Sequence, residues 1–184
     1  MSGQGRWSGT IIRGHWFNVA IITKYRVTQS AIEQAGPTTA YAQQWAVARL
    51  QGSNRPEPRQ QFIQDIKRLL KQLKKDGNKV ILMMDANEAL GKNKNGVSTI
   101  TSDCDLIDVH TSRHNDAATT ATYARGTKKI DYILITPDLL PLVTRSGMLP
   151  FYTGIHTDHR GLFIDIDSKA LFQGKIAELY THPA

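Results

Sequence analysis

Runs of apolar and polar residues along the chain predict strands and helices that follow one another. β-forming residues dominate on either side of Gly14, which predicts a β-hairpin over 7–13 and 15–23. Apolar side chains at helical spacing predict helices of roughly 39–50 and 62–73, and a turn signal follows the second one. Such an alternation of strands and helices is typical of an α/β fold.

The most informative stretch joins a buried strand to a group of polar residues. Five apolar residues, 80–84, follow the turn without interruption, and Asp85, Asn87 and Glu88 come directly after them. A short run of this kind predicts a strand buried on both faces, and α/β proteins tend to carry their chemistry at the ends of such strands. In extended geometry Asp85 and Asn87 point to the same side, where they can orient a water, hold a phosphate oxygen or help to bind a hard cation. The alternative is an Asx turn that only ends the strand.

Later segments predict shorter strands over 106–109, 130–135 and 161–167. Asp131 lies inside the second of these among apolar neighbours, and a buried aspartate is costly unless it has a partner. We expect one domain over residues 1–184, with 168–184 as an appended arm outside the core.

Composition places the chain among ordinary globular proteins, with 40% hydrophobic and 21% charged residues. No apolar run approaches the roughly 20 residues that span a bilayer, and the first residues do not form a secretory signal. Cys104 is the only cysteine, which excludes an internal disulfide and a cysteine-based zinc site. These features predict an intracellular protein of the nucleus or cytoplasm that is neither secreted nor membrane-bound.

The net charge of +7 favours an anionic partner, with nucleic acid ahead of a phosphorylated small molecule or a membrane surface. Lysines on the helix after residue 62 are expected to form a solvated face. Two other basic groups lie close in sequence to the candidate site residues, and we predict that they contact nucleic acid: Lys92 and Lys94, and Arg125, Lys128 and Lys129.

Four separated segments, taken in order, resemble the endonuclease/exonuclease/phosphatase superfamily, which has the DNase I-like fold. Lys24-Tyr25-Arg26-Val27 looks like the tyrosine segment of that family. Met84-Asp85-Ala86-Asn87 stands where the family usually has Gly-Asp-x-Asn, with Met84 in place of the glycine. The last two motifs are matched closely by Lys129-Ile130-Asp131-Tyr132-Ile133-Leu134 and Thr157-Asp158-His159-Arg160.

The resemblance implies an α/β fold of four layers, αββα, in which two mixed sheets pack face to face between helices. It also implies hydrolysis of a phosphoester with Mg²⁺ or Mn²⁺. Asp131 would orient His159, which would face the scissile phosphate. Asp85 would orient or deprotonate the attacking water.

Three further residues receive roles from the same resemblance. Asn87 would help to hold the water or the phosphate, and Tyr25 would donate to the phosphate or assist the leaving group. Asp158 is a hard oxygen ligand of the kind that Mg²⁺ prefers. We therefore expect Asp131 and His159 to be hydrogen-bonded, and Tyr25, Asp85, Asn87, Asp158 and His159 to converge on one pocket.

The chain departs from the family pattern before Tyr25. Family members have an Asn and a metal-binding Glu in their first strands, whereas the first acidic residue here is Glu33. The chain is therefore expected to lack those strands, with an impaired metal site, or to be completed by an upstream segment or a larger polyprotein. Glu88 is the candidate for a substitute metal ligand. Residues 36–44 and the arm look most like family versions found near retroelements.

Three functions stay open from the sequence. The first is a metal-dependent phosphodiester hydrolase, endonuclease-like, that acts on nucleic acid, with DNA preferred over RNA. The second is a catalytically weak nucleic-acid-binding remnant. The third is a small-molecule phosphatase on the same fold, because a fold does not fix its substrate.

Overall fold

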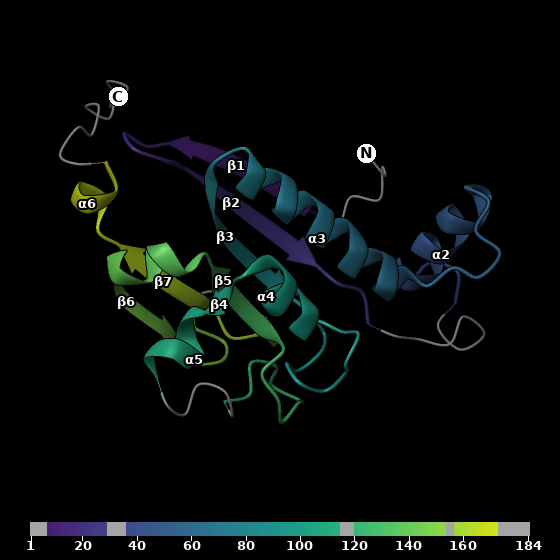
Figure 1. Cartoon of the computed structure of the whole chain (residues 1–184). Coiled ribbons are helices and arrows are strands. Elements are labelled where there is room, and N and C mark those ends of the chain that lie inside the picture. The colour runs from purple at the N-terminus through teal and green to yellow at the C-terminus, as the bar shows by residue number, and fades with distance from the viewer. Residues whose placement is uncertain (1–6, 29–35, 115–119, 154–156, 173–184) are drawn as a thin grey trace, which may run out of the picture.

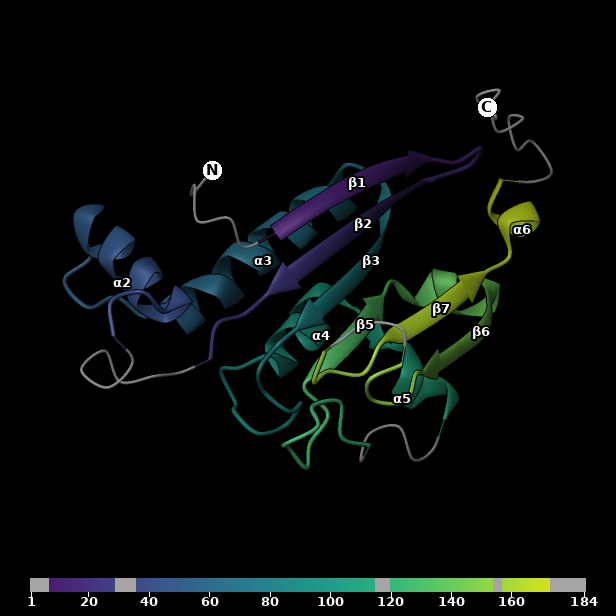
Figure 2. The same ribbon diagram turned by 180° about the vertical axis from the view of Figure 1, so that it is seen from behind.

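The computed structural model describes residues 7–28, 36–114, 120–153 and 157–172. A mixed five-stranded sheet has the order β1-β2-β3-β5-β4, and a second sheet pairs β6 with β7 (Figures 1 and 2). The strands are β1 (Trp7–Arg13), β2 (Asn18–Tyr25), β3 (Asn78–Asp85), β4 (Ile107–Asp108), β5 (Asp131–Ile135), β6 (Val143–Met148) and β7 (Leu162–Ile166). The helices are α2 (Ala40–Leu50), α3 (Pro58–Lys75), α4 (Ser98–Cys104), α5 (Val109–Arg113), α6 (Ser168–Phe172) and the 3₁₀ helix η1 (Pro137–Leu142).

Strand pairing brings the ends of three strands together. β2 runs parallel to β3, so both strands end at the same edge of the sheet, where Tyr25 is paired with Asp85. β5 runs antiparallel to β3, so it begins where β3 ends, and Asp131 is paired with Asp85. Three polar residues from distant parts of the chain therefore lie side by side.

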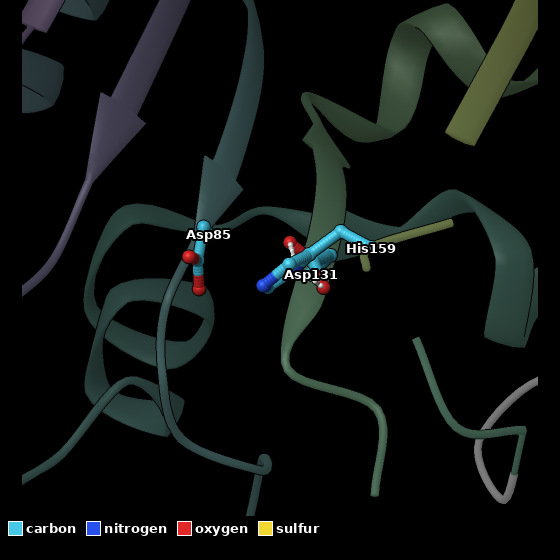
Figure 3. Close-up of side chains that lie close together, drawn as sticks. All are labelled: Asp85, Asp131 and His159. Carbon is cyan, nitrogen blue, oxygen red and sulfur yellow. Dashed lines mark hydrogen bonds and ion pairs between the residues drawn. The ribbon is translucent and has the colours of Figure 1, made fainter. Parts of the chain in front are cut away.

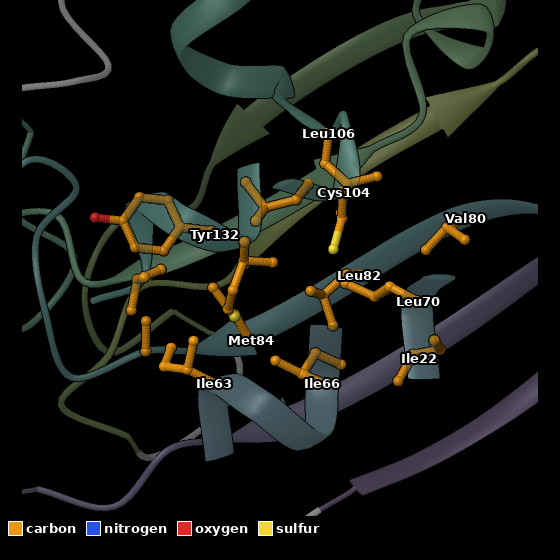
Figure 4. Close-up of a cluster of buried hydrophobic side chains, with 14 of the residues drawn as sticks. Ile22, Ile63, Ile66, Leu70, Val80, Leu82, Met84, Cys104, Leu106 and Tyr132 are labelled. Carbon is orange, nitrogen blue, oxygen red and sulfur yellow. The ribbon is translucent and has the colours of Figure 1, made fainter. Parts of the chain in front are cut away.

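The first core fills the space between the five-stranded sheet and helices α3 and α4 (Figure 4). Helix α3 places Phe62, Ile63, Ile66 and Leu70 on one buried face, as its 3.6-residue apolar period requires. These side chains pack on alternate residues of β3, among them Leu82, because successive strand residues point to opposite faces of the sheet.

The second core lies on the opposite face of the five-stranded sheet. Ile81 and Ile133 pack there with residues of α5, η1, β6 and β7, and Leu171 of α6 is buried in the same cluster. The arm predicted over 168–184 therefore needs correction at Leu171 and Phe172, which pack in this core, whereas residues 168–170 are exposed. Residues 173–184 lie outside the described part of the chain.

The observed elements confirm the predicted hairpin, both long helices and the central strand. Helices α4, α5 and α6 and strand β6 were not predicted. Val109 begins α5 instead of ending a strand, because β4 has only two residues. A mixed five-stranded sheet and a second sheet agree with the predicted α/β fold, and among the described residues the second sheet is a single antiparallel pair. Helix α5 contacts β6.

Within the described ranges, every helix is too short or too polar to cross a membrane.

Candidate active site at the ends of β2, β3 and β5

The imidazole of His159 is bonded to the carboxylate of Asp131, which confirms the predicted pairing. Nδ1 of His159 lies 3.0 and 3.1 Å from the two carboxylate oxygens of Asp131. A carboxylate accepts hydrogen bonds, so Nδ1 carries the proton and Nε2 is the nitrogen left for chemistry. Figure 3 shows this pair beside Asp85 at the end of the neighbouring strand.

Asp85 is held in place by Asn87. The backbone N–H of Asn87 donates to Oδ1 of Asp85 at 2.9 Å, and the side-chain amide donates to Oδ2 at 3.2 Å. Asn87 has a φ of 47°, a left-handed conformation that asparagine tolerates better than most residues. The expected extended geometry is therefore wrong, and the Asx turn that was the alternative is present. That turn also fixes the carboxylate at the site.

Burial raises the pKa of Asp85 to about 6, and the nearby charge of Asp131 adds to the rise, while hydrogen bonds from Asn87 and the charge of His159 oppose it. Tyr25 keeps 44% of its surface exposed at the end of β2. Burial and the charge of Asp85 raise the pKa of the Tyr25 phenol, against a side-chain hydrogen bond with Asn87. Tyr25, Asp85 and Asn87 are thus mutual neighbours at this edge, with Asp131 and His159 beside them.

Asp158 does not join this group, although it precedes His159. Its carboxylate accepts a hydrogen bond of 2.9 Å from the exposed guanidinium of Arg125. This contact lowers the pKa of the Asp158 carboxyl. Asp158 is thus engaged by an arginine in this structure, and its predicted role as a metal ligand stays a prediction.

Glu88 has a structural role in place of the predicted metal-binding one. Its side chain is buried and pairs with Arg26 at 3.1 Å and Arg59 at 3.2 Å. Its second oxygen accepts the backbone N–H of Val97 at 2.9 Å. With both oxygens used inside the protein, the carboxylate holds the loop that follows β3 and does not face Asp85.

The five predicted nucleic-acid contacts divide into two groups. Lys92, Lys94, Arg125 and Lys128 are exposed, as such contacts require. Lys129 is buried and pairs with Asp108 at 2.5 Å, so its predicted contact with nucleic acid is wrong. A lysine hidden from solvent in an ion pair cannot reach a phosphate without breaking that pair.

Four residues that position the site were not predicted. The guanidinium groups of Arg26 and Arg59 donate to backbone carbonyls of Ala86 and Asn87, which fixes the turn after β3. The hydroxyl of Tyr132 accepts the N–H of Leu90 and so holds the same loop. The hydroxyl of Thr122 accepts the N–H groups of Ile130 and Asp131. Arg26 adjoins Tyr25 in the sequence, but nothing in its spacing indicates that it would be buried.

Asp85, Asp131 and His159 also form the group best placed to hold a cation in the described part of the chain. Each offers one ligand atom, and these atoms lie within 4.8 Å of one another. Carboxylate oxygens suit Mg²⁺ and Mn²⁺, and burial, with the nearby charge of Asp131, raises the pKa of Asp85. The donor set therefore fits a divalent cation, with Asp85 as its main anchor because Asp131 already holds His159.

Comparison with solved structures identifies the fold. The chain superposes on the endonuclease domain of TRAS1, a telomere-specific non-LTR retrotransposon, with a TM-score of 0.55, 16% identity, and 88% of this chain and 63% of that one covered. It superposes on a 3′ phosphatase, NExo, from Neisseria bound to a product DNA hairpin, with a TM-score of 0.58, 16% identity, and 88% and 65% covered. For the AP endonuclease LMAP from Leishmania major the TM-score is 0.62 at 14% identity, with 87% and 54% covered.

The chain therefore has the DNase I-like fold, and it spans between 54% and 65% of the length of these three proteins. No protein-family model matches the sequence. No curated protein matches it either.

Proposed function

We propose that this chain is a metal-dependent phosphodiester hydrolase that acts on nucleic acid in an endonuclease-like way. The observation that carries the proposal is the group of Asp85, Asp131 and His159, with ligand atoms within 4.8 Å of one another at one sheet edge. An imidazole held by a carboxylate, next to a second carboxylate of raised pKa, is a combination suited to moving protons during hydrolysis.

Each side chain has a role that follows from its contacts. Asp131 accepts the Nδ1–H of His159, so Nε2 faces the substrate: the neutral ring accepts a proton there, and the imidazolium donates its Nε2–H to a phosphate oxygen. Asp85, whose pKa is about 6, is basic enough to accept a proton from an attacking water and is kept in position by Asn87. Tyr25 lies near enough to Asp85 to donate to a phosphate oxygen bound at the same edge.

A divalent cation bound at Asp85 would neutralise the negative charge that grows on the phosphate during the reaction. The substrate class follows from charge and from fold. The chain has a net charge of +7, and Lys92, Lys94 and Lys128 are exposed. Structures of the same fold include an endonuclease domain and a 3′ phosphatase bound to a DNA hairpin, which supports DNA as the first substrate to test.

A specific observation favours the second candidate, a nucleic-acid-binding protein of low catalytic activity. Both carboxylates predicted as metal ligands, Glu88 and Asp158, are paired with arginines. Among the described residues this leaves Asp85 as the one carboxylate at the site that is not engaged with a cationic or imidazole group. One carboxylate with water ligands gives a weak Mg²⁺ site.

The test is cleavage of supercoiled plasmid DNA and of a labelled DNA duplex by the purified chain with Mg²⁺, with Mn²⁺ and with chelator. The proposal expects metal-dependent cleavage that falls at least about 100-fold in His159→Ala and in Asp85→Asn, because general acid–base groups contribute about 10²–10⁴-fold. Tight DNA binding without cleavage in either metal would favour the second candidate. Hydrolysis of a small phosphate ester, with no effect on DNA, would favour a small-molecule phosphatase.

Two control variants separate chemistry from damage to the fold. His114→Ala removes an exposed histidine that contacts Ser146 on the second sheet. Asp165→Asn removes an exposed carboxylate that pairs with Arg145. Both controls should cleave like the wild type, and equal loss in controls and site variants would overturn the assignment of the site.

A further inference from the structure

A cleft lies between α2, the loop that follows it, α3 and the open end of the β1–β2 hairpin. Its volume is about 950 Å³, which is large for a polar cleft on a small domain. Glutamines are the commonest lining residues: Gln44, Gln51, Gln60, Gln61, Gln64 and Gln72. The primary amide of glutamine both donates and accepts hydrogen bonds, so this lining suits a ligand with mixed polar edges.

Gln44 lines the cleft and carries a buried acceptor without a partner among the described residues. Its side chain is more than nine-tenths buried, yet the amide oxygen has no hydrogen-bond partner among the described residues. Buried polar atoms are nearly always paired, because an unpaired acceptor loses its hydration without compensation. The terminal torsion of glutamine is broad, so the amide can turn toward a ligand that supplies a donor.

Trp7 supplies an aromatic surface at the same cleft. It lines the cavity and keeps 43% of its surface exposed. The ammonium of Lys24 lies 5.6 Å from the centre of the Trp7 ring and 5.2 Å from that of Phe62, so a largely buried cation sits beside the indole. Exposed aromatic rings next to positive charge are a common platform for stacking the bases of single-stranded nucleic acid.

The charges of the lining agree with an anionic strand. Arg55 and Arg68 are both exposed at the cleft. Of the two acidic lining residues, Asp65 is engaged by Gln61 at 2.8 Å and by Arg68 at 3.4 Å, and Glu57 is exposed. With Lys24 the lining has three cationic and two anionic side chains, so it is weakly positive, and Arg68 would meet a phosphate by leaving Asp65.

The cleft lies close to the catalytic edge. Trp7 is paired with Lys24, which immediately precedes Tyr25, and Tyr25 is paired with Asp85. Strands in a sheet are about 4.8 Å apart, so the backbones of Trp7 and of the end of β3 are separated by roughly 10 Å. Lys24 and Met84 face α3, so Tyr25 and Asp85, one residue further along their strands, face the other side of the sheet. A strand with a phosphate at Asp85 must therefore bend around the end of β2, past Tyr25, to enter the cleft, and an unpaired strand is flexible enough to do so.

We propose that this cleft binds an unpaired stretch of nucleic-acid strand that flanks the scissile phosphate. An unpaired base stacks on Trp7, and Gln44 accepts a hydrogen bond from its exocyclic amine. The inference rests on the proposed function for the identity of the polymer, and it adds a preference for substrates with a single-stranded extension over fully paired duplexes.

The test measures binding in chelator, where no cleavage takes place. Fluorescein-labelled duplexes that are blunt or carry a six-nucleotide extension at either end are titrated with the purified chain, and anisotropy is recorded. The wild type should bind one of the extended duplexes about tenfold more tightly than the blunt one, as expected for one or two stacked bases. Trp7→Ala and Gln44→Leu should remove that difference and leave the affinity for the blunt duplex within about twofold.

Matched controls are available beside both residues. Trp16→Ala removes an exposed tryptophan at the opposite end of the hairpin, and Gln43→Ala removes the exposed glutamine next to Gln44. Both should retain the preference. Gln44→Leu removes an unpaired buried acceptor, so it should not destabilise the fold.

The binding inference and the catalytic proposal can be refuted independently of each other. Equal affinity of the wild type for extended and blunt duplexes, or an unchanged preference in both cleft variants, would overturn this inference even if the protein cleaves DNA. A preference that depends on Trp7 and Gln44 would uphold it even if no metal supports cleavage, and the catalytic proposal would fail alone.

Discussion

Asp85 is the residue whose chemistry depends most on its neighbours. It ends β3, is paired with the first residue of β5, and accepts a hydrogen bond from the backbone N–H of Asn87. Burial and the charge of Asp131 place its pKa near 6, about two units above that of an exposed aspartate. Above this pH the ionised Asp85 therefore lowers the stability of the folded protein. Such strongly perturbed groups are common in active sites.

Asp85→Asn should stabilise the metal-free protein, and the gain should depend on pH. Because the folded pKa is raised, the contribution of Asp85 to stability is largest below about pH 4 and is lost as the pH rises through 6. Asparagine has no proton to lose, so the variant should gain about 1 to 2 kcal/mol above pH 6 and little at pH 4.5, after allowance for solvent screening. Urea unfolding in chelator between pH 4.5 and 8 measures this, with Asp165→Asn as a control that shows no such trend. A gain that is the same at every pH would contradict the assignment.

Glu88→Gln tests whether this glutamate is structural. The change leaves the buried guanidinium groups of Arg26 and Arg59 without their anion, so the free energy of unfolding should fall by about 3 kcal/mol. Denaturant titration provides the measurement, and Glu57→Gln, an exposed change, should be neutral. If Glu88→Gln were as stable as the wild type but bound Mn²⁺ more weakly, the metal-ligand role would have to be restored.

Among whole elements, length and apolar continuity decide what could be predicted from the sequence. Helix α3 and strand β3 have unbroken patterns and were predicted with their main residues. Helices α4 and α5 have seven and five residues with mostly polar sequences, so no period is visible. β6 follows a 3₁₀ helix and has polar residues on both of its faces, so its sequence shows no alternation. Its pairing with β7 decides its conformation.

The site divides in the same way. A lone acid in an apolar strand indicated that Asp131 needs a partner, and the family resemblance implied that this partner is His159. The roles of Glu88 and Lys129 depend on contacts with Arg26 and Asp108, which are 62 and 21 residues away in the chain. Local sequence shows that a residue is charged, but tertiary contacts decide whether that charge faces solvent, substrate or another buried ion.

Lys128 and Lys129 are adjacent in the loop that leads into β5, and we expect their substitution to have different effects. Lys128 is exposed, so Lys128→Ala should leave stability unchanged and lower the slope of log affinity against log salt by about 1. Lys129→Met leaves Asp108 buried without a cation, so it should cost about 3 kcal/mol of stability. Filter binding of DNA at several salt concentrations and thermal unfolding give the two readouts. A normal salt slope in Lys128→Ala together with a stable, weakly binding Lys129→Met would reverse the two assignments.

Across the whole molecule, the site stands where the two sheets meet. Asp85 and Asp131 belong to the five-stranded sheet, whereas His159 precedes β7 of the second sheet and is tied to Tyr123 by a β-bridge. The hydrogen bond between Asp131 and His159 therefore joins segments whose positions depend on the packing of both cores. Any change that shifts the second sheet should affect chemistry as well as stability.

Cation binding should stabilise the whole chain through this one edge. A ligand that binds only the folded state adds RT ln(1 + [L]/Kd), which is about 1.4 kcal/mol at ten times a millimolar Kd. For a domain of this size that corresponds to a rise in Tm of about 3 to 5 °C in 10 mM Mn²⁺. Asp85→Asn removes the main anchor and should show almost no rise, while Asp158→Asn, which loses only an exposed pair with Arg125, should respond like the wild type.

Differential scanning fluorimetry with chelator, Mg²⁺ and Mn²⁺ measures all three proteins. Equal shifts in the wild type and Asp85→Asn would place the cation elsewhere, and a shift lost only in Asp158→Asn would return that residue to the metal site.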